Sequence, residues 1–182
     1  MDKLIDDLIK LAFAEDIGDG DHTTLCCIPE TAMGKSQLII KEDGVLAGVE
    51  MAKRIFHDFD PELKMTVFIQ DGAEVKKGDI AFVVEGKIQS LLQTERLMLN
   101  VMQRMSGIAT TTRKYAKALE GTKTHVLDTR KTTPGMRMIE KEAVRIGGGM
   151  NHRIGLFDMI LLKDNHVDFA GGIEQAVTGA QN

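Results

Sequence analysis

Cationic and polar side chains follow two short apolar segments in the second half of this chain. The residues DTRK come after the apolar pair Val126-Leu127, and the residues KDNH come after the apolar run 159–162. A third polar group, NHR at 151–153, follows three consecutive glycines. Guanidinium and ammonium groups bind carboxylates and phosphates through charge-assisted hydrogen bonds. These residue types therefore indicate a binding site for a small anionic ligand.

The charge balance favours a small ligand over a nucleic acid. Between Asp128 and His166 there are seven Lys and Arg residues against five acidic residues, whereas the whole chain has a formal net charge of −4. Proteins that bind nucleic acids usually carry a broad basic face and a high isoelectric point. Here the isoelectric point is about 5.7. With no Trp and one Tyr, the chain also offers little aromatic surface for stacking bases.

The elements that must position these side chains follow the order strand, charged loop, helix, glycine turn, strand, charged loop. This order is typical of βαβ units, in which functional residues lie at the carboxyl ends of the strands. We therefore expect strands at 125–127 and 159–162, with a helix between them. Within that helix, three cations spaced four residues apart beside two acids are typical of a solvated face with ion pairs: Arg137, Lys141 and Arg145, with Glu140 and Glu142.

The first half of the chain mixes helical and strand patterns. Apolar residues at helical spacing predict an amphipathic helix over 3–14. The acid- and glycine-rich stretch 15–24 is interpreted as a tight loop, because it lacks the closing Glu of a calcium-binding loop. The remaining elements are expected in the order strand 36–41, hairpin turn Asp43-Gly44 into 45–47, helix 49–59 and strand 64–69.

The pattern DGxxVxxGD at 71–79 resembles the hammerhead of lipoyl and biotinyl carrier domains. Those domains carry a lysine at a hairpin tip, flanked by Met or Asp and by Ala, and no such tripeptide is present here. Gly72 and Gly78 are therefore interpreted as turns that join short strands of a small sheet. A non-catalytic carrier or interaction module is kept as an alternative function.

Residues 88–119 predict the longest helix of the chain. Ser106-Gly107 is expected to interrupt it and to mark a domain boundary, which gives predicted domains at 1–106 and 107–182. Arg96 lies on the apolar-rich side, where an isolated Arg more often extends its charged group into solvent (snorkelling) or is ion-paired than binds a ligand. The wide apolar face is typical of a core or a subunit interface: Ile88, Leu91, Leu92, Leu99 and Met102, widened by Met98, Val101 and Met105.

Size and cysteine content suggest a cytoplasmic protein. A chain of 182 residues with 43% hydrophobic residues can bury a substantial core and has no apolar run long enough to span a membrane. The N-terminus carries acids throughout and does not have the pattern of a signal peptide. The adjacent cysteines, Cys26 and Cys27, are a poor pair for a disulfide. Two free thiols in a reducing cytoplasm are therefore expected.

Several motifs together resemble those of the quinolinate phosphoribosyltransferase family, the carboxylating nicotinate-nucleotide pyrophosphorylases. The most specific are TRKTTPG at 129–135, GGGMNHR at 147–153 and LLKDNH at 161–166. Earlier pieces that fit, in the same order, are EDIGDGDHTT, GVLAG, QTERLMLN and SGIAT. Each motif alone is weak, but the similarity covers essentially the whole chain.

The resemblance implies transfer of a phosphoribosyl group from 5-phosphoribosyl-1-pyrophosphate to quinolinate, a step of NAD biosynthesis. The products would be nicotinate mononucleotide, carbon dioxide and pyrophosphate, and Mg²⁺ would accompany the phosphoribosyl donor. The implied fold is an α/β fold, with an N-terminal open α/β sandwich followed by an incomplete parallel α/β barrel. The implied assembly is a homodimer.

The resemblance also assigns roles to individual residues. Lys131 and Lys163 are the expected catalytic residues, and Lys163 would stabilise the electrons that decarboxylation leaves on the pyridine ring. His152 is expected to orient the substrate rather than to act as a base. Asp164 and His166 are expected to satisfy backbone groups at the end of a strand. The implied quinolinate-binding residues are Thr129, Arg130, Lys131, His152, Arg153 and Lys163, with Arg96 reaching the site of the neighbouring subunit.

The family continues through further strand–helix units, and none follows Asn182 in this chain. Those units carry acidic residues for the Mg²⁺–ribose part and glycine-rich loops for the phosphate. We therefore expect the protein ligands of Mg²⁺ beyond the chain end, and little or no transferase activity from a catalytically incomplete fragment. A same-fold phosphoribosyltransferase that acts on another acid is the second alternative.

Overall fold

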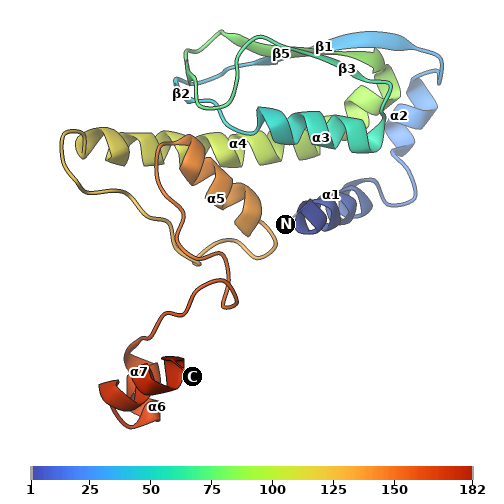
Figure 1. The fold of residues 1–182 in the computed structure, drawn as a ribbon. Helices are drawn as coiled ribbons and strands as arrows, with labels where there is room; N and C mark the ends of the chain where they lie inside the picture. Colours follow the sequence, from blue (N-terminus) through green and yellow to red (C-terminus); the bar gives the residue numbers. More distant parts are fainter. Residues whose placement is uncertain (1, 182) are drawn as a thin grey trace. The chain divides into compact units, whose positions relative to one another are not determined.

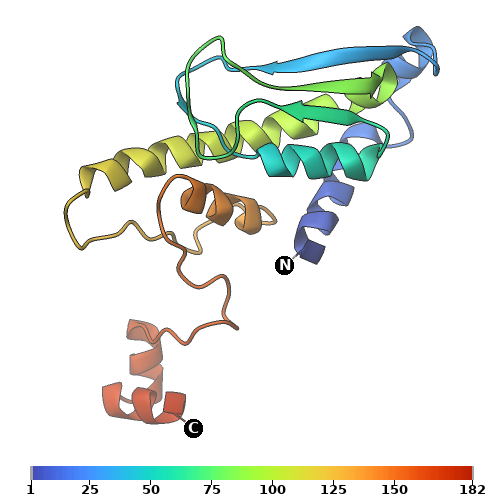
Figure 2. The same cartoon turned by 45° about the horizontal axis from the view of Figure 1, so that its top comes forward.

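The computed structural model describes residues 2–181, and its internal contacts divide the chain into two units, Met1–Asn151 and His152–Asn182. In the first unit, a small sheet lies over helices α3 (Val49–Phe59) and α4 (Ile88–Ala118) (Figures 1 and 2). The second unit contains two short helices, α6 (Asp164–Ala170) and α7 (Ile173–Gln181). Helices and strands are mixed, as the predicted α/β class requires.

The sheet of the first unit has the strand order β1-β5-β3, and both pairs of neighbours are antiparallel. The edge strands are β1 (Met33–Ile39) and β3 (Lys64–Val67), and the central strand is β5 (Ile80–Lys87). Four consecutive residues of β5, 81–84, are buried. This unbroken apolar run suits a strand that is flanked by two others and packed against helices. The strands predicted at 36–41 and 64–69 are thus present with shifted ends.

Asp43-Gly44 does not form the predicted hairpin turn. β2 (Gly44–Val45) pairs with β4 (Glu74–Val75) in a separate two-stranded sheet, while β1 pairs with β5. The partners are distant in sequence, so a local turn signal could not reveal them. Gly72 and Gly78 do make turns, with φ of 89° and 98°, ahead of β4 and β5 respectively.

The core of the first unit lies between the sheet and helices α3 and α4. Helix α3 has the predicted bounds, and its Phe56 meets Phe82 of β5 edge to face, with ring centroids 6.3 Å apart. Five of the eight residues of the predicted apolar face of α4 are buried (Leu91, Met98, Val101, Met102 and Met105), whereas Leu92 is 43% exposed. The buried residues of α4 are Ser90, Leu91, Thr94, Met98, Val101, Met102, Met105, Ala109 and Thr112.

Helix α4 runs without interruption through Ser106-Gly107, contrary to the predicted break. Ser106 contributes to packing there, because its Oγ accepts from the Ala47 N–H at 3.0 Å and donates to the Ala47 carbonyl at 3.1 Å. A glycine inside a helix costs only about 1 kcal/mol relative to alanine. Buried residues on both sides of Gly107 offset that cost.

Helix α1 (Asp2–Ile17) extends the predicted amphipathic helix, and helix α2 (His22–Cys27) begins inside the stretch interpreted as a loop. Asp21 caps α2, because its Oδ1 accepts from the Thr24 N–H at 3.0 Å. Hydrogen bonding from the Thr24 side chain, followed by that from its N–H, lowers the pKa of Asp21. Cys26 and Cys27 are free thiols and exposed, as predicted. None of the helices formed within residues 2–181 could span a lipid bilayer.

Candidate active site

The cationic loop at 129–136 begins where two chain segments meet. Leu127 forms an isolated parallel bridge with Met150. The Asp128 N–H donates to the Met150 carbonyl at 3.1 Å, and the Met150 N–H donates to the Val126 carbonyl at 2.8 Å. Helix α5 (Arg137–Ile146) connects the two segments. The βαβ order is therefore present, although the predicted strand 125–127 is reduced to a single bridge.

The second predicted strand, 159–162, is not formed. Within the described residues of the second unit there is no strand, and Met159 and Ile160 are 50% and 69% exposed. A strand needs a neighbouring strand to pair with, and no strand within residues 2–181 pairs with this segment. The apolar run alone did not determine its conformation.

Helix α5 and the adjoining turn of α4 hold the backbone of the cationic loop. The Arg137 Nε–H donates to Thr132 Oγ1 at 3.0 Å, and an Arg137 NH2 group donates to the Arg130 carbonyl at 3.5 Å. Glu140 accepts from the Thr133 N–H at 3.3 Å and from Arg104 Nε at 2.9 Å. Glu140 is buried, so it does not lie on a solvated face as predicted.

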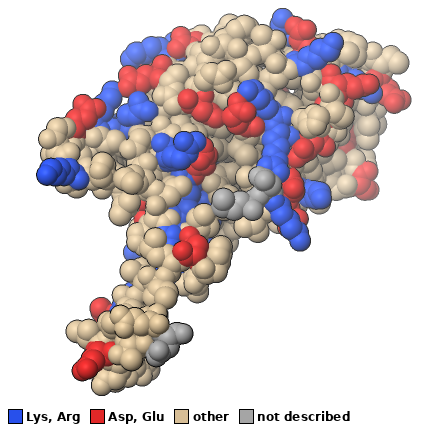
Figure 3. Space-filling model, in the orientation of Figure 1, with Lys and Arg blue, Asp and Glu red and all other residues tan. Residues whose placement is uncertain are grey.

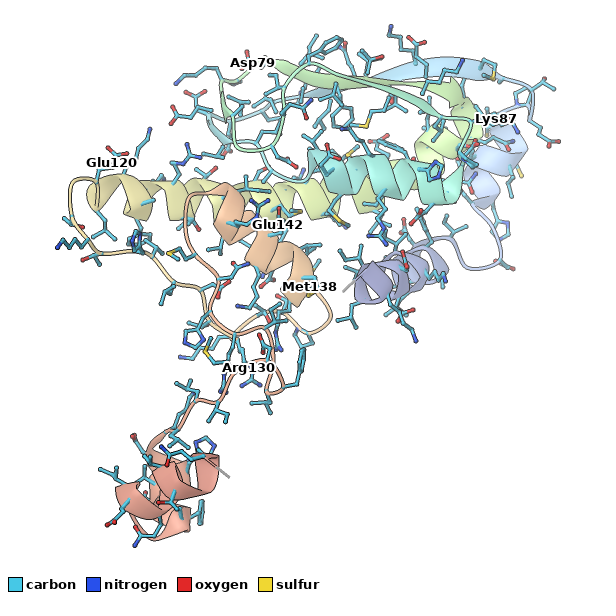
Figure 4. All side chains as sticks on the ribbon, in the orientation of Figure 1. Asp79, Lys87, Glu120, Arg130, Met138 and Glu142 are labelled. Atoms are coloured by element: carbon cyan, nitrogen blue, oxygen red, sulfur yellow. The ribbon has the colours of Figure 1, made fainter. Side chains whose placement is uncertain are left out.

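The loop presents Arg130 and Lys131 without ion-pair partners among the described residues. Figure 4 labels Arg130 on this loop, near the beginning of α5. The Arg130 Nε atom is buried and has no hydrogen-bond partner among residues 2–181. Lys131 is exposed, and its N–H donates to Thr129 Oγ1 at 3.1 Å, which tightens the turn. A buried guanidinium nitrogen without a partner is costly, so an anionic ligand would stabilise this arrangement.

Asp128 and Lys141 form a buried ion pair at the base of the loop. Lys141 Nζ lies 2.5 Å from Asp128 Oδ1, and their side chains are 3% and 6% exposed respectively. With its amide nitrogen turned toward the carboxylate, Asn151 donates to Asp128 Oδ2 at 2.8 Å and to the Lys141 carbonyl at 2.9 Å. Lys141 was predicted on a solvated helix face, and this prediction is wrong. Helix α5 packs on α4, and Asp128 covers its Lys141 side.

Of the three cations predicted on a solvated face of α5, Arg145 is the one that lies on such a face. Arg145 pairs with Glu142 on the exposed side of α5, and this ion pair raises the pKa of Arg145. Figure 4 labels Glu142 on this helix, together with Met138 one turn before it. Arg145 therefore offers a control position for substitutions in the loop, because it lies on the same helix and its guanidinium group donates to Glu142.

The three glycines that follow α5 allow close packing at its carboxyl end. A Cβ atom on Gly147 would lie 2.6 Å from the Ala109 carbonyl oxygen, and one on Gly149 would lie 2.7 Å from Val144 Cγ1. Gly148, between them, has φ of 95°. Arg113 of α4 caps the same end by donating from Nε to the Gly147 carbonyl at 3.0 Å. The motif thus brings the chain back beside Leu127.

In the second unit, hydrogen bonds fold the segment that begins at His152. The Arg153 N–H donates to His152 Nδ1 at 2.8 Å, and Arg153, which is buried, donates from NH1 to the Met159 carbonyl at 3.1 Å. Asp158 accepts from the Ile154 and Gly155 N–H groups at 2.7 and 2.8 Å. These two hydrogen bonds lower the pKa of Asp158.

Lys163 directly precedes α6 and is exposed. Its N–H donates to His166 Nδ1 at 2.9 Å. His166 therefore satisfies a backbone group, as predicted, although at the start of a helix rather than at the end of a strand. Asp164 is the first residue of α6, where a carboxylate favours the positive end of the helix dipole.

Arg96 is exposed on α4, and no ion pair holds it among the described residues. An open groove of about 1060 Å³ runs along the same helix, beside β1 and the segment that leads to β2. Leu92, Glu95 and Leu99 of α4 line this groove, within one turn of Arg96. Arg96 is thus not ion-paired within residues 2–181, and its exposed position agrees with the alternative that its charged group extends into solvent.

Two family models match this chain and together cover nearly all of it. The N-terminal domain of quinolinate phosphoribosyl transferase matches residues 21–106, and the C-terminal domain of the same family matches residues 108–182. Among solved structures, NadC from Streptococcus pyogenes superimposes with a TM-score of 0.92 and 41% identity, covering 100% of this chain and 64% of that one. The chain therefore belongs to the quinolinate phosphoribosyltransferase family, as the motifs predicted.

Curated relatives agree with this assignment. Quinolinate phosphoribosyltransferase [decarboxylating] 1 of Nicotiana glauca is 48% identical over 171 residues, which are 93% of this chain and 48% of the relative. A probable nicotinate-nucleotide pyrophosphorylase [carboxylating] of Synechocystis is 44% identical, over 96% of this chain and 59% of the relative. The chain thus spans about half the length of the curated relatives it matches.

Four residues that support the loop were not predicted as part of the site: Arg104, Glu140, Lys141 and Asn151. A signal was present for two of them, because the helix of a βαβ unit packs both on a neighbouring helix and on its own strands. A helix with two covered sides has little room for a solvated face, so charged residues on it must be paired. The pairing of Arg104 and Asn151 depends on tertiary contacts, and no local pattern indicates it.

Proposed function

We propose that this chain forms part of an enzyme that transfers a phosphoribosyl group from 5-phosphoribosyl-1-pyrophosphate to quinolinate with decarboxylation. The products are nicotinate mononucleotide, carbon dioxide and pyrophosphate. The observation that carries the proposal is the loop 129–131, which offers Arg130 and Lys131 without ion-pair partners on a backbone fixed by α5. Relatives named as quinolinate phosphoribosyltransferase or nicotinate-nucleotide pyrophosphorylase share 44–49% identity with the chain over 93–96% of its length.

The residue types suit a planar ring with two adjacent carboxylates. Guanidinium groups match carboxylates with two parallel hydrogen bonds, which is why we assign substrate binding to Arg130 and Arg153. A dianion bound among these side chains also reduces the repulsion between the cations that surround it. The remaining proposed binding residues are Thr129, Lys131, His152 and Lys163, with Arg96 supplied to the site of a second subunit.

Positioning and electrostatics provide most of the catalysis in this proposal. The pyridine nitrogen attacks the anomeric carbon of the ribose while pyrophosphate leaves, and no proton needs to move at that step. Loss of the 2-carboxylate as carbon dioxide leaves an electron pair on the ring carbon, which then takes up a proton. The quaternised nitrogen absorbs part of that charge, and we assign Lys131 and Lys163 to stabilise the remainder.

Mg²⁺ enters this proposal only as a companion of the phosphoribosyl donor. Within residues 2–181, no group of three or more His, Cys, Asp or Glu side chains is arranged to hold a metal ion. Any contact of these residues with the donor-bound Mg²⁺ would therefore use at most two such side chains.

A cytoplasmic location is part of the same proposal. The free, exposed thiols of Cys26 and Cys27 suit a reducing compartment. On the face shown in Figure 3, cationic and acidic side chains are interspersed rather than gathered into a basic surface, which favours a small ligand over a nucleic acid or an anionic membrane. Cell fractionation with an antibody against the chain would test the location, and recovery in a membrane or organelle fraction would refute it.

Quinolinate binding to the 182-residue chain tests the function directly. Isothermal titration calorimetry should detect binding of quinolinate and weaker binding of nicotinate, which has one carboxylate. Arg130→Ala and Arg153→Ala should each weaken binding about 10- to 150-fold, which corresponds to the loss of one charge-assisted hydrogen bond of roughly 1.5–3 kcal/mol.

Arg145→Ala is the matched control, because it removes an exposed cation whose partner is Glu142 on the same helix. It should leave the affinity unchanged. Equal affinity for quinolinate and nicotinate would favour a transferase of the same fold for another acid. Equal losses in all three variants would indicate nonspecific attraction and refute the assignment of the site.

A further inference from the structure

The buried ion pair of Asp128 and Lys141 lies at a point where two cationic segments begin. Thr129, Arg130 and Lys131 follow Asp128 directly in sequence, and His152 and Arg153 follow Asn151 directly. Asp128 and Asn151 are joined to each other by a hydrogen bond of 2.8 Å, and both contact Lys141. The Lys141 side chain thus holds Asp128, and the Asn151 side chain connects Asp128 to the Lys141 backbone carbonyl, so the residues that precede the two cationic segments are joined through α5.

The burial of this pair calls for an explanation other than stability. Desolvation of two charges largely cancels their attraction, and apolar residues of similar volume often replace a buried ion pair without loss of stability. An ion pair does specify geometry, because its atoms must meet at hydrogen-bond distance. Both carboxylate oxygens of Asp128 are engaged, Oδ1 by Lys141 and Oδ2 by Asn151, so the position of the carboxylate is fixed from two directions.

Asp128, Lys141 and Asn151 lie on three different segments of the chain. Asp128 ends the segment that pairs with Met150, Lys141 is in the middle of α5, and Asn151 follows the glycine turn. The Asp128 N–H also donates to the Met150 carbonyl at 3.1 Å, next to the Asn151 side chain that contacts its carboxylate. A shift of α5 would therefore move both segment starts together.

We propose that Asp128, Lys141 and Asn151 act as a positioning clamp that sets the starting points of the two cationic segments for recognition of the dicarboxylate substrate. None of the three touches the substrate in this proposal. They act through Arg130 and Lys131 on one side and through His152 and Arg153 on the other. The inference rests on the proposed function for its substrate, but the clamp itself is a property of the protein without ligand.

Amide hydrogen exchange on the free protein tests the clamp independently of any ligand. Lys141→Met keeps the length of the side chain and removes its charge. It should increase exchange in peptides covering 128–133 and 150–154 together, while peptides from 95–105 in α4 stay unchanged. Ile139→Val, a small deletion in the buried side of the same helix, is the matched control and should not affect the two segments selectively. Increased exchange in only one segment, or in neither, would overturn the clamp.

A second arm separates positioning from plain stability. The double variant Asp128→Asn/Lys141→Met removes both charges, so it should recover folding stability relative to either single variant. If the pair positions the cations, its affinity for quinolinate stays about 10- to 100-fold below that of the wild type despite the recovered stability. Affinity that returns to the wild-type level would overturn the clamp.

Quinolinate binding by the wild type distinguishes a failure of the clamp from a failure of the proposed substrate. If the wild type binds quinolinate and the Ile139→Val control binds equally well, a loss in the double variant supports positioning. If the wild type does not bind quinolinate but the exchange of the two segments increases together, the clamp stands and the assigned substrate is wrong. If quinolinate binds and the clamp variants match the wild type in both measurements, the substrate stands and the clamp is wrong.

Discussion

At the scale of single residues, the position of the cationic loop depends on how closely α5 approaches α4. Gly147 ends α5 at the point where the two helices touch, and Arg113 of α4 donates to its carbonyl oxygen. At the other end of α5, Glu140 forms an ion pair with Arg104 of α4. Small residues and paired charges therefore fix the position of α5, and α5 in turn holds the cationic loop.

Gly147→Ala should destabilise the first unit. The added Cβ would lie 2.6 Å from the Ala109 carbonyl oxygen and 2.7 Å from Thr112 Cβ, so the helices must separate. We expect a loss of roughly 1–3 kcal/mol in the free energy of unfolding, which is the usual range for overpacking. Urea denaturation followed by circular dichroism measures this loss.

Gly107→Ala provides the matched control on α4. Nothing lies within 4 Å of a Cβ atom at this exposed helical position, so alanine should be neutral or stabilise by up to about 1 kcal/mol. The interpretation of Gly147 as a close-packing residue is wrong if both substitutions change stability in the same direction and by the same amount.

At the scale of elements, short segments are held by carboxylates that accept backbone N–H groups. Asp21 does this at the start of α2, and Asp71 caps α3 by accepting from the Val49 N–H at 2.8 Å. Asp158 does the same for the segment that follows Arg153. In each case a charged acceptor replaces the missing hydrogen bonds of a chain end or turn.

The segment around Asp158 should loosen in acid. Hydrogen bonds from the Ile154 and Gly155 N–H groups lower the pKa of Asp158, so the carboxylate stays charged below the ordinary aspartate range. Its contribution to the turn is complete above the unfolded-state pKa of about 3.9 and is lost as the pH falls through the lower folded-state pKa.

NMR spectra can follow the Ile154 and Gly155 amide resonances from about pH 6 to about pH 2. This range spans the ordinary aspartate pKa of about 3.9. Both should shift together, with a midpoint below that of aspartate in an unfolded peptide. Asp158→Asn should abolish this transition. A midpoint at or above the peptide value would contradict the proposed hydrogen bonding.

At the scale of the whole molecule, the first unit contains most of the buried apolar side chains. Except for Ala176, every buried hydrophobic residue of the described chain lies between Ile9 and Ala143. The groove along α4 lies in this unit and leaves Leu92 43% exposed next to Arg96. Exposed apolar surface beside an unpaired cation is typical of an interface.

We propose that a second copy of the chain occupies this groove. Arg96 would then reach the proposed quinolinate site of that second subunit. Sedimentation velocity should show a dimer of the wild type and a shift toward monomer for Leu92→Glu, because a charge would then be buried without a partner. Leu11→Glu alters another exposed leucine, on α1, and should leave the dimer intact. A monomeric wild type, or equal dissociation of both variants, would refute this interface.

The sequence by itself determined the family, most helices and the loop that carries Arg130 and Lys131. Periodicity located the two ends of α3 and of α4 to within a residue, because amphipathic spacing and glycine turns are local properties of the chain. Only the tertiary structure decided that β1 pairs with β5, that α4 continues through Gly107 and that Lys141 is buried against Asp128. Each of these depends on partners far apart in the chain, and a local pattern records what a residue can do but not which neighbour it meets.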